Sequence, residues 1–245
     1  MIYRKRLYEN YVSGNKQFLR DLNPAPQKQD IRNTLNLRRA LATWMEKVPR
    51  NSKVLDVACG PGNILCLLQE KGFTNLHGVD ISFEQVQLAR QKFPQVICTD
   101  AIEYLLQHPN EFLLITAFDI LEHFNKEESI RFLDAISSAL VSGGRLILQV
   151  PNGDSPFAGG TIYGDLTHEV TYTTISLKHI LLTCGFSNVQ FQEHGPQPTS
   201  FKGVIRYIIW GMLRQILRLI HLVETGGIST GIYTRVMQAT AVKAQ

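Results

Sequence analysis

Residues 53–63 read KVLDVACGPGN, and this stretch decides the fold. Its first six residues form a mostly apolar, valine-rich run, which is typical of a buried strand. Gly60 and Gly62 then allow a sharp turn, and residues 62–71 have the spacing of an amphipathic helix. A strand, a glycine-rich turn and a helix in this order begin a β-α-β unit, which predicts the α/β class.

Similar units follow along the chain. Further strands are predicted at 76–80, 95–99, 112–120, 145–150, 187–193 and 231–242. Helical patterns lie near 29–48, 83–93, 101–108, 126–141, 174–184 and 203–224. We therefore predict a Rossmann-like, doubly wound and mostly parallel seven-stranded sheet with helices on both faces.

The composition is that of a globular protein. With 245 residues, 44% of them hydrophobic and 19% charged, the chain is neither disordered, collagen-like nor a coiled coil. The four cysteines have no C-x-x-C spacing and no paired histidines, so we predict neither a disulfide framework nor a structural zinc site. Asp165, His168 and Glu169 fall within five residues of one loop and lack further ligands, so we predict no metal ion. Because the sequence shows neither a signal peptide nor 18 consecutive apolar residues, we expect a cytoplasmic protein.

Three carboxylates follow three successive predicted strands: Asp56, Asp80 and Asp100. The carboxyl ends of parallel strands meet at one edge of a sheet, so these side chains should converge on one crevice. Asp80 lies 20 residues after Gly60, which is the spacing at which an acidic side chain accepts the hydroxyls of a ribose. Asp100 would then meet an adenine amino group.

Two classes of nucleoside cofactor use this geometry. Dinucleotide sites favour G-x-G-x-x-G and seldom begin the turn with a carboxylate, because it would repel the pyrophosphate. Here Asp56 begins the turn, and Leu65 stands where the third glycine would be. A cofactor with a cationic amino acid suits Asp56 better, so we predict binding of S-adenosylmethionine and not of NAD.

The run VLDVACGPGN resembles motif I of class I S-adenosylmethionine-dependent methyltransferases, with Ala58 in place of the first glycine. Three later segments resemble further motifs of that family, in the same order: GVDIS (78–82), CTDA (98–101) and AFDILEHF (117–124). The resemblance implies four sets of cofactor contacts: the methionine part by Asp56, Gly60 and Gly62, the ribose by Asp80 and Ile81, the adenine by Asp100 and Ala101, and the sulfonium by Asp119 and Ile120. Arg38 could pair with the cofactor carboxylate, although a solvated position explains it equally well.

On this interpretation residues 1–245 form a single methyltransferase domain. Residues 1–50 are an N-terminal helical segment, and residues 51–150 are the cofactor-binding core. Residues 151–245 hold the acceptor loop, the last strands and an amphipathic helix over 203–224.

The glycine- and proline-rich loop 151–169 should lie over the acceptor side of the crevice. It contains Asp165, His168 and Glu169. A carboxylate beside a histidine orients the ring and raises its pKa, so we predict His168 as general base, oriented by Asp165 or Glu169. His123 is the second candidate. The alternative is a hydrogen-bonded cluster that only stabilises the loop.

Residues 150–173, VPNGDSPFAGGTIYGDLTHEVTYT, resemble methyltransferases of bacterial surface-glycan gene clusters, including O-antigen and capsule pathways. This resemblance implies O-methylation of a sugar of a surface polysaccharide or of its lipid-linked precursor. The alternatives are a quinone, lipid or natural-product hydroxyl as acceptor, and a non-catalytic cofactor-binding module. We do not expect a nucleic acid partner, because N-P-P-Y and D-P-P-Y are absent and aromatic and basic residues do not interleave.

Charge is distributed unevenly along the chain. Lys and Arg outnumber Asp and Glu by eleven to four in residues 1–50 and by six to one in residues 200–245, whereas residues 51–199 hold eight against sixteen. In the helix 203–224 the basic side chains lie within a sector of about 120° beside a broad apolar face. This pattern predicts peripheral contact with an anionic inner membrane, or else packing on the sheet or on a second copy in a homodimer.

Overall fold

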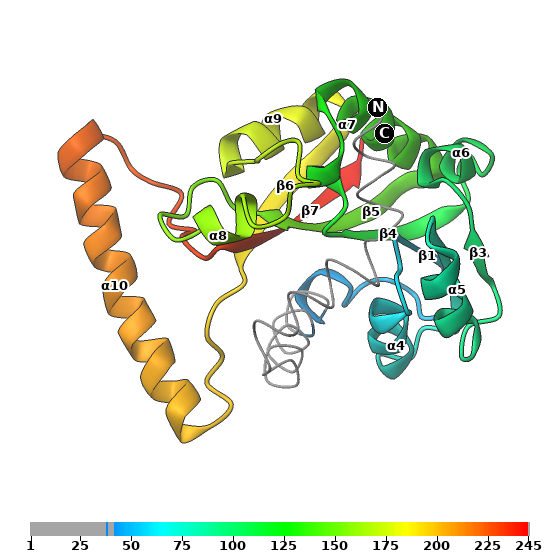
Figure 1. Ribbon diagram of the computed structural model, residues 1–245, viewed down its shortest axis with the longest axis horizontal. Coiled ribbons are helices and arrows are strands. Elements are labelled where there is room, and N and C mark those ends of the chain that lie inside the picture. Colours follow the sequence, from blue (N-terminus) through cyan, green and yellow to red (C-terminus); the bar gives the residue numbers. More distant parts are fainter. Residues whose placement is uncertain (1–37, 39–41, 245) are drawn as a thin grey trace.

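The computed structural model describes residue 38 and residues 42–244, so most of the predicted helix 29–48 and all of the segment before it lie outside the described residues. Seven strands form one sheet in the order β3-β2-β1-β4-β5-β7-β6 (Figure 1). The strands are β1 (Lys53–Val57), β2 (Asn75–Asp80), β3 (Val96–Cys98), β4 (Phe112–Phe118), β5 (Leu140–Pro151), β6 (Phe186–Glu193) and β7 (Val236–Lys243). The helices are α4 (Asn63–Glu70), α5 (Phe83–Arg90), α6 (Ala101–Leu106), η2 (Leu121–His123), α7 (Lys126–Ala139), α8 (Gly159–Ile162), α9 (Thr174–Thr183) and α10 (Phe201–Thr225).

Strand β7 runs antiparallel to both of its neighbours, and the other strand pairs are parallel. The predicted seven-stranded, mostly parallel sheet is therefore confirmed, with strand bounds that shift by a few residues. As a result, the carboxyl ends of β1 to β6 meet at one edge of the sheet. This edge is where open α/β sheets bind their ligands.

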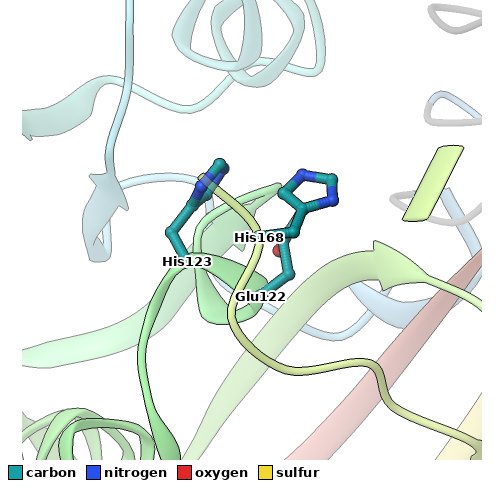
Figure 2. A group of neighbouring side chains, drawn as sticks. All are labelled: Glu122, His123 and His168. Atoms are coloured by element: carbon teal, nitrogen blue, oxygen red, sulfur yellow. The ribbon is translucent and has the colours of Figure 1, made fainter. Parts of the chain in front are cut away.

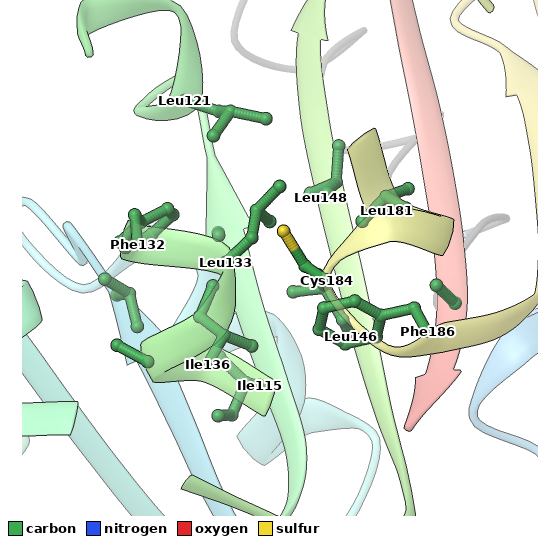
Figure 3. Packing of buried hydrophobic residues seen from close by; sticks show 14 of the residues in the cluster. Ile115, Leu121, Phe132, Leu133, Ile136, Leu146, Leu148, Leu181, Cys184 and Phe186 are labelled. Atoms are coloured by element: carbon green, nitrogen blue, oxygen red, sulfur yellow. The ribbon is translucent and has the colours of Figure 1, made fainter. Parts of the chain in front are cut away.

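Alternation along the strands builds a hydrophobic core on each face of the sheet. Leu114 packs with α4 and α5 on one face, and its neighbour Ile115 packs with α6, α7 and α9 on the other. Figure 3 shows this second cluster, in which Cys184 lies among leucine, isoleucine and phenylalanine side chains. Burial raises the pKa of the Cys184 thiol to about 12, so this cysteine behaves as a small apolar residue.

Helix α10 departs from this layered pattern. It joins the end of β6 to the start of β7 and projects away from the sheet (Figure 1). None of its 25 residues is buried, although most of them are apolar. The predicted helix is confirmed, and of the alternatives left open for its apolar face, packing on the sheet is not observed among the described residues. Among the described helices, none has the length and apolar character needed to cross a membrane.

Candidate active site

The turn after β1 has the backbone geometry that its sequence predicts. Gly60 and Gly62 have φ angles of 52° and 86°, in the left-handed region that glycine adopts at little cost. A Cβ atom on Gly62 would lie 3.2 Å from the Phe93 ring, so a side chain there would be crowded as well as strained in φ. Ala58, where the family motif has glycine, also has a positive φ of 55°. This conformation costs alanine about 1 kcal/mol.

Contrary to the sequence prediction, Asp56 does not begin the turn but lies buried within β1 beneath it. Its Oδ1 accepts a hydrogen bond of 2.6 Å from the Thr116 hydroxyl, whereas its buried Oδ2 has no hydrogen-bond partner among the described residues. Burial, together with the nearby charge of Asp80, raises the pKa of the Asp56 carboxyl to about 7. A buried polar atom without a partner destabilises a protein by about 1–3 kcal/mol, so a ligand that satisfied Oδ2 would gain affinity.

Asp80 connects the ends of β1 and β2. Its Oδ2 accepts from the Gly60 N–H and its Oδ1 from the Ser82 N–H, both at 2.8 Å. Each carboxylate oxygen has two lone pairs, so both keep one for a ligand hydroxyl. The next residue, Ile81, is 71% exposed and offers an apolar surface at the same edge. The predicted ribose position therefore has a fixed carboxylate.

Asp100 is the N-cap residue of α6, a role that was not predicted from the sequence. Its Oδ1 caps α6 by accepting from the N–H groups of Ile102 and Glu103, at 2.9 and 3.0 Å. Only Oδ2 is then left for an adenine amino group. Ala101, the first residue of α6, lies half-buried beside it.

Of the two alternatives for Arg38, the structure agrees with the solvated position. The Arg38 guanidinium forms an ion pair with Glu70, the last residue of α4. Gly62 and the crevice lie at the other end of α4, which spans about 12 Å at 1.5 Å per residue. Arg38 therefore braces the far end of this helix and does not face the cofactor crevice.

Asp119 takes part in a polar network that joins the ends of β4, β5 and β6. The Gln149 amide donates to both Asp119 oxygens at 3.1 Å, and the Gln149 carbonyl oxygen accepts from His194 at 2.9 Å and from Gln238 at 3.0 Å. Burial, aided by the charge of Arg235, lowers the pKa of His194 to about 4, so this ring is neutral. Sequence reasoning missed Gln149 and His194, although a glutamine inside the apolar run RLILQV was a usable signal.

Asp119 itself is exposed and has a positive φ of 52°, which turns the chain out of β4. Ile120, which follows it, is half-buried and packs against the core cluster. At the crevice edge, the Asp119 residue is therefore more exposed than Ile120.

On the acceptor side, the loop after β5 brings His168 close to His123, with ring centroids 4.9 Å apart (Figure 2). The His168 Nδ1 bonds to the Ile162 carbonyl at 3.0 Å. The carboxylate of Asp165 instead accepts from the Thr167 N–H and hydroxyl. The partner of His168 Nδ1 is thus a backbone carbonyl and not the predicted carboxylate.

The other carboxylate predicted to orient His168 belongs to Glu169. This residue is exposed, and its N–H donates to the Glu122 carbonyl at 2.8 Å, which fixes the loop against η2. The predicted role of His168 as a base stays a prediction.

Glu122 is the residue of this group that sequence reasoning missed. It is buried beside the two histidines, and burial together with the charge of Asp119 raises its pKa well above the usual value. The motif LEH contains both Glu122 and His123, but only the histidine was recognised as a candidate.

A cavity of about 430 Å³ lies between the end of β6 and the inner side of α10. Its lining includes aromatic, amide and charged side chains: Gln192, Glu193, Gln197, Tyr207, Trp210, Arg214 and Arg218. Arg214 donates to Glu193 at 2.7 Å, and this ion pair ties α10 to the body. Because β6 runs parallel to β5, the cavity lies at the carboxyl end of β6, with β5 and β7 between it and the end of β4.

Solved structures share this fold. The chain is similar to a SAM-dependent methyltransferase from Archaeoglobus fulgidus, with 21% identity, a TM-score of 0.63 and coverage of 98% of this chain and 99% of the other. It is also similar to 1,6-didemethyltoxoflavin-N1-methyltransferase of Burkholderia thailandensis, solved with bound 1,6-didemethyltoxoflavin and S-adenosylhomocysteine. In that comparison the identity is 17%, the TM-score is 0.61 and the coverage is 99% and 89%.

Sequence comparison gives the family. The chain is 40% identical over 77 residues to YqeM of Bacillus subtilis (strain 168), which is named as a methyltransferase; the match spans 31% of this chain and 28% of that protein. Residues 29–192 match the family model described as a methyltransferase domain. This match covers well over half of the chain and includes the glycine-rich turn, the three strand-end carboxylates and His168. The chain therefore belongs to the methyltransferase domain family.

Proposed function

We propose that this methyltransferase uses S-adenosylmethionine as methyl donor and methylates an oxygen of a sugar, in a bacterial surface polysaccharide or its lipid-linked precursor. Family membership and the crevice at the ends of β1 to β4 support the donor. The observation that carries the acceptor class is the cavity between β6 and α10.

The donor site fits the parts of S-adenosylmethionine. Its methionine part carries an ammonium group, which would donate to the unpartnered Oδ2 of Asp56 and would favour the ionised carboxyl. Gly60 and Gly62 leave the backbone of the turn open to the ligand. Asp80 and Asp100 keep acceptor lone pairs for the ribose hydroxyls and the adenine amino group.

The acceptor cavity suits a sugar, because a pyranose ring has apolar C–H faces and a hydroxylated edge. Trp210 and Tyr207 offer aromatic surface with polar tips. Two further atoms in the lining, Nε2 of Gln192 and Nε of Arg214, are buried without a hydrogen-bond partner among the described residues. Hydroxyl groups of a bound sugar would satisfy them. A volume of about 430 Å³ lies within the usual range for small-molecule sites.

Methyl transfer needs an acceptor oxygen in line with the sulfonium methyl group. The oxygen bonds to the methyl carbon, the carbon–sulfur bond breaks with its electron pair moving to sulfur, and the hydroxyl proton leaves. His123, His168 and Glu122 are the titratable groups that η2 and the acceptor loop bring together for this last event (Figure 2).

The test is transfer of a radiolabelled methyl group from S-adenosylmethionine to lipid-linked glycan acceptors, with a demethylated quinone as competing acceptor. We expect label in the glycan fraction, and we expect Trp210→Ala to raise the acceptor KM at least tenfold. Leu106→Ala, an exposed change on α6, is the control and should behave as wild type. Label on the quinone alone would replace the sugar proposal with its rival.

Helix α10 adds a proposal about location, because its two sides differ. The inner side lines the cavity with Tyr207, Trp210, Arg214 and Arg218. The outer side is a continuous row of exposed apolar residues: Phe201, Ile205, Ile208, Ile209, Met212, Ile216, Leu219, Ile220 and Val223. Monomeric proteins rarely expose apolar patches larger than a few hundred Å², so this outer face needs a covering surface.

Charge favours an anionic membrane over a second copy as that surface. Helix α10 contains four basic residues, Lys202, Arg206, Arg214 and Arg218, and a single acidic one, Glu224. Arg214 pairs with Glu193 and, like Arg218, lies on the inner side, which leaves Lys202 and Arg206 beside the outer face. Two such helices packed by their outer faces would bring these like charges close, whereas anionic lipid would attract them. With α10 in the membrane interface, the cavity on its inner side would lie near lipid-linked sugars.

A further inference from the structure

Glu122, His123 and His168 form a compact group of potential metal ligands. One ligand atom of each lies within 4.8 Å of the others, and no other such group of three or more occurs among the described residues. Figure 2 shows the three side chains converging from η2 and from the loop after β5. Neither segment is near the other in sequence, so the fold itself assembles the group.

Hydrogen bonds fix the tautomer of both rings in their neutral form. The Ile162 carbonyl can only accept, so Nδ1 of His168 carries the hydrogen and Nε2 carries the lone pair. The Thr167 hydroxyl gives its hydrogen to Asp165 at 2.6 Å, so at 2.9 Å from Nδ1 of His123 it must accept. Histidines that bind metals through Nε2 commonly have this arrangement, with Nδ1–H donated to an oxygen.

Glu122 supplies an independent observation. Its side chain is buried, with 2% of the residue exposed, and its Oε2 has no hydrogen-bond partner among the described residues. Its backbone carbonyl accepts from the N–H groups of Glu169 and Val170, which locks η2 and the acceptor loop together. An unsatisfied buried carboxyl oxygen beside two imidazoles is a position that a cation would satisfy.

We propose that Glu122, His123 and His168 bind one divalent first-row metal ion, through a carboxylate oxygen and two imidazole Nε2 atoms. This proposal differs from the sequence prediction of no metal ion. Three protein ligands leave coordination positions open to water or to an acceptor oxygen. Because imidazole is a nitrogen ligand, Zn²⁺ should bind more tightly than Mn²⁺, and Mg²⁺ should bind weakly.

The consequence for catalysis rests on the function proposed above. An acceptor hydroxyl bound to the ion would lose its proton to water more readily, because a divalent cation lowers the pKa of a coordinated O–H group. The resulting oxygen would then bond to the methyl carbon as the carbon–sulfur bond breaks and its electron pair passes to sulfur.

The test is titration of the metal-free protein with ZnCl₂ and MnCl₂ by calorimetry. We expect one site per chain in the wild type, and at least tenfold weaker Zn²⁺ binding in His168→Ala and in Glu122→Gln. His179→Ala, which removes an exposed histidine of α9, is the matched control and should bind Zn²⁺ as wild type does. Zn²⁺ binding that is absent in the wild type, or unchanged in both site variants, would overturn the proposal.

Two further measurements keep the outcome clear. If a site variant fails to fold, the visible absorption of Co²⁺ added to the wild type decides, because bound Co²⁺ with imidazole ligands absorbs and hydrated Co²⁺ barely does. Binding of S-adenosylhomocysteine is measured in parallel on the same samples. A wild type that binds Zn²⁺ but not S-adenosylhomocysteine would count against the proposed donor only. A wild type that binds S-adenosylhomocysteine but not Zn²⁺ would count against the metal site only.

Discussion

The donor side and the acceptor side of the crevice are built in different ways. On the donor side, Asp56 and Asp80 lie in or at the end of central strands, and their positions follow from the register of the sheet. On the acceptor side, His168 lies on a loop and Trp210 on a helix without a single buried residue. The sheet therefore fixes the binding of the cofactor, while insertions after β5 and β6 select the acceptor.

This difference predicts that changes on the two sides separate into distinct kinetic effects. Donor-side variants should lose affinity for the cofactor and its product. Acceptor-side variants should lose turnover or acceptor affinity while the cofactor still binds.

The largest expected effect is on the acceptor side. His168→Ala should lower turnover about a hundredfold or more, because the ring is either the proton acceptor or a ligand for the ion that ionises the hydroxyl. The affinity for S-adenosylhomocysteine, measured by calorimetry, should stay within about threefold of wild type. An equal loss of cofactor affinity would mean that the two sides are not independent.

Asp80→Ala is the corresponding change on the donor side. It removes the acceptor for the ribose hydroxyls and also releases the N–H groups of Gly60 and Ser82. At a few kcal/mol for charged hydrogen bonds, we expect about a hundredfold weaker binding of S-adenosylhomocysteine by calorimetry. The Zn²⁺ affinity of the same variant should be unchanged, and unchanged cofactor binding would remove Asp80 from the site.

The contrast also explains how much could be predicted from the sequence. The strands, the glycine-rich turn and the carboxylates at 56 and 80 follow from period and spacing, since consecutive strands and turns are local features. The position of Arg38 and the partner of His168 could not be predicted, because each depends on side chains that meet only in the folded chain. Glu122 was not predicted as a site residue because the neighbouring sequence does not distinguish a buried glutamate from a solvated one.

Asp56 predicts a dependence on pH. Its pKa is about 7 in the folded chain against the usual 3.8, so between these values the folded state binds a proton that the unfolded state has lost. The free energy of unfolding should therefore fall as pH rises from about 4 to about 7, by at most about 1.4 kcal/mol per pH unit, and then level off. Urea denaturation should show a shallower fall for Asp56→Asn. An identical pH profile in the variant would contradict the assignment.

The smallest effects concern the outer face of α10, which contributes little to the fold because its apolar residues are exposed. Flotation with anionic vesicles at low salt should recover the wild type and lose Ile216→Glu, since a charge replaces an apolar side chain that is half exposed. Arg206→Gln should weaken binding to the vesicles by about 1 kcal/mol, or roughly fivefold, and added salt should also weaken it. Leu182→Glu, on the exposed side of α9, is the control and should float as wild type does. Both glutamate variants should unfold at the wild-type temperature. Failure of the wild type to float, together with a dimer that Ile216→Glu splits, would instead make a second copy the partner of α10.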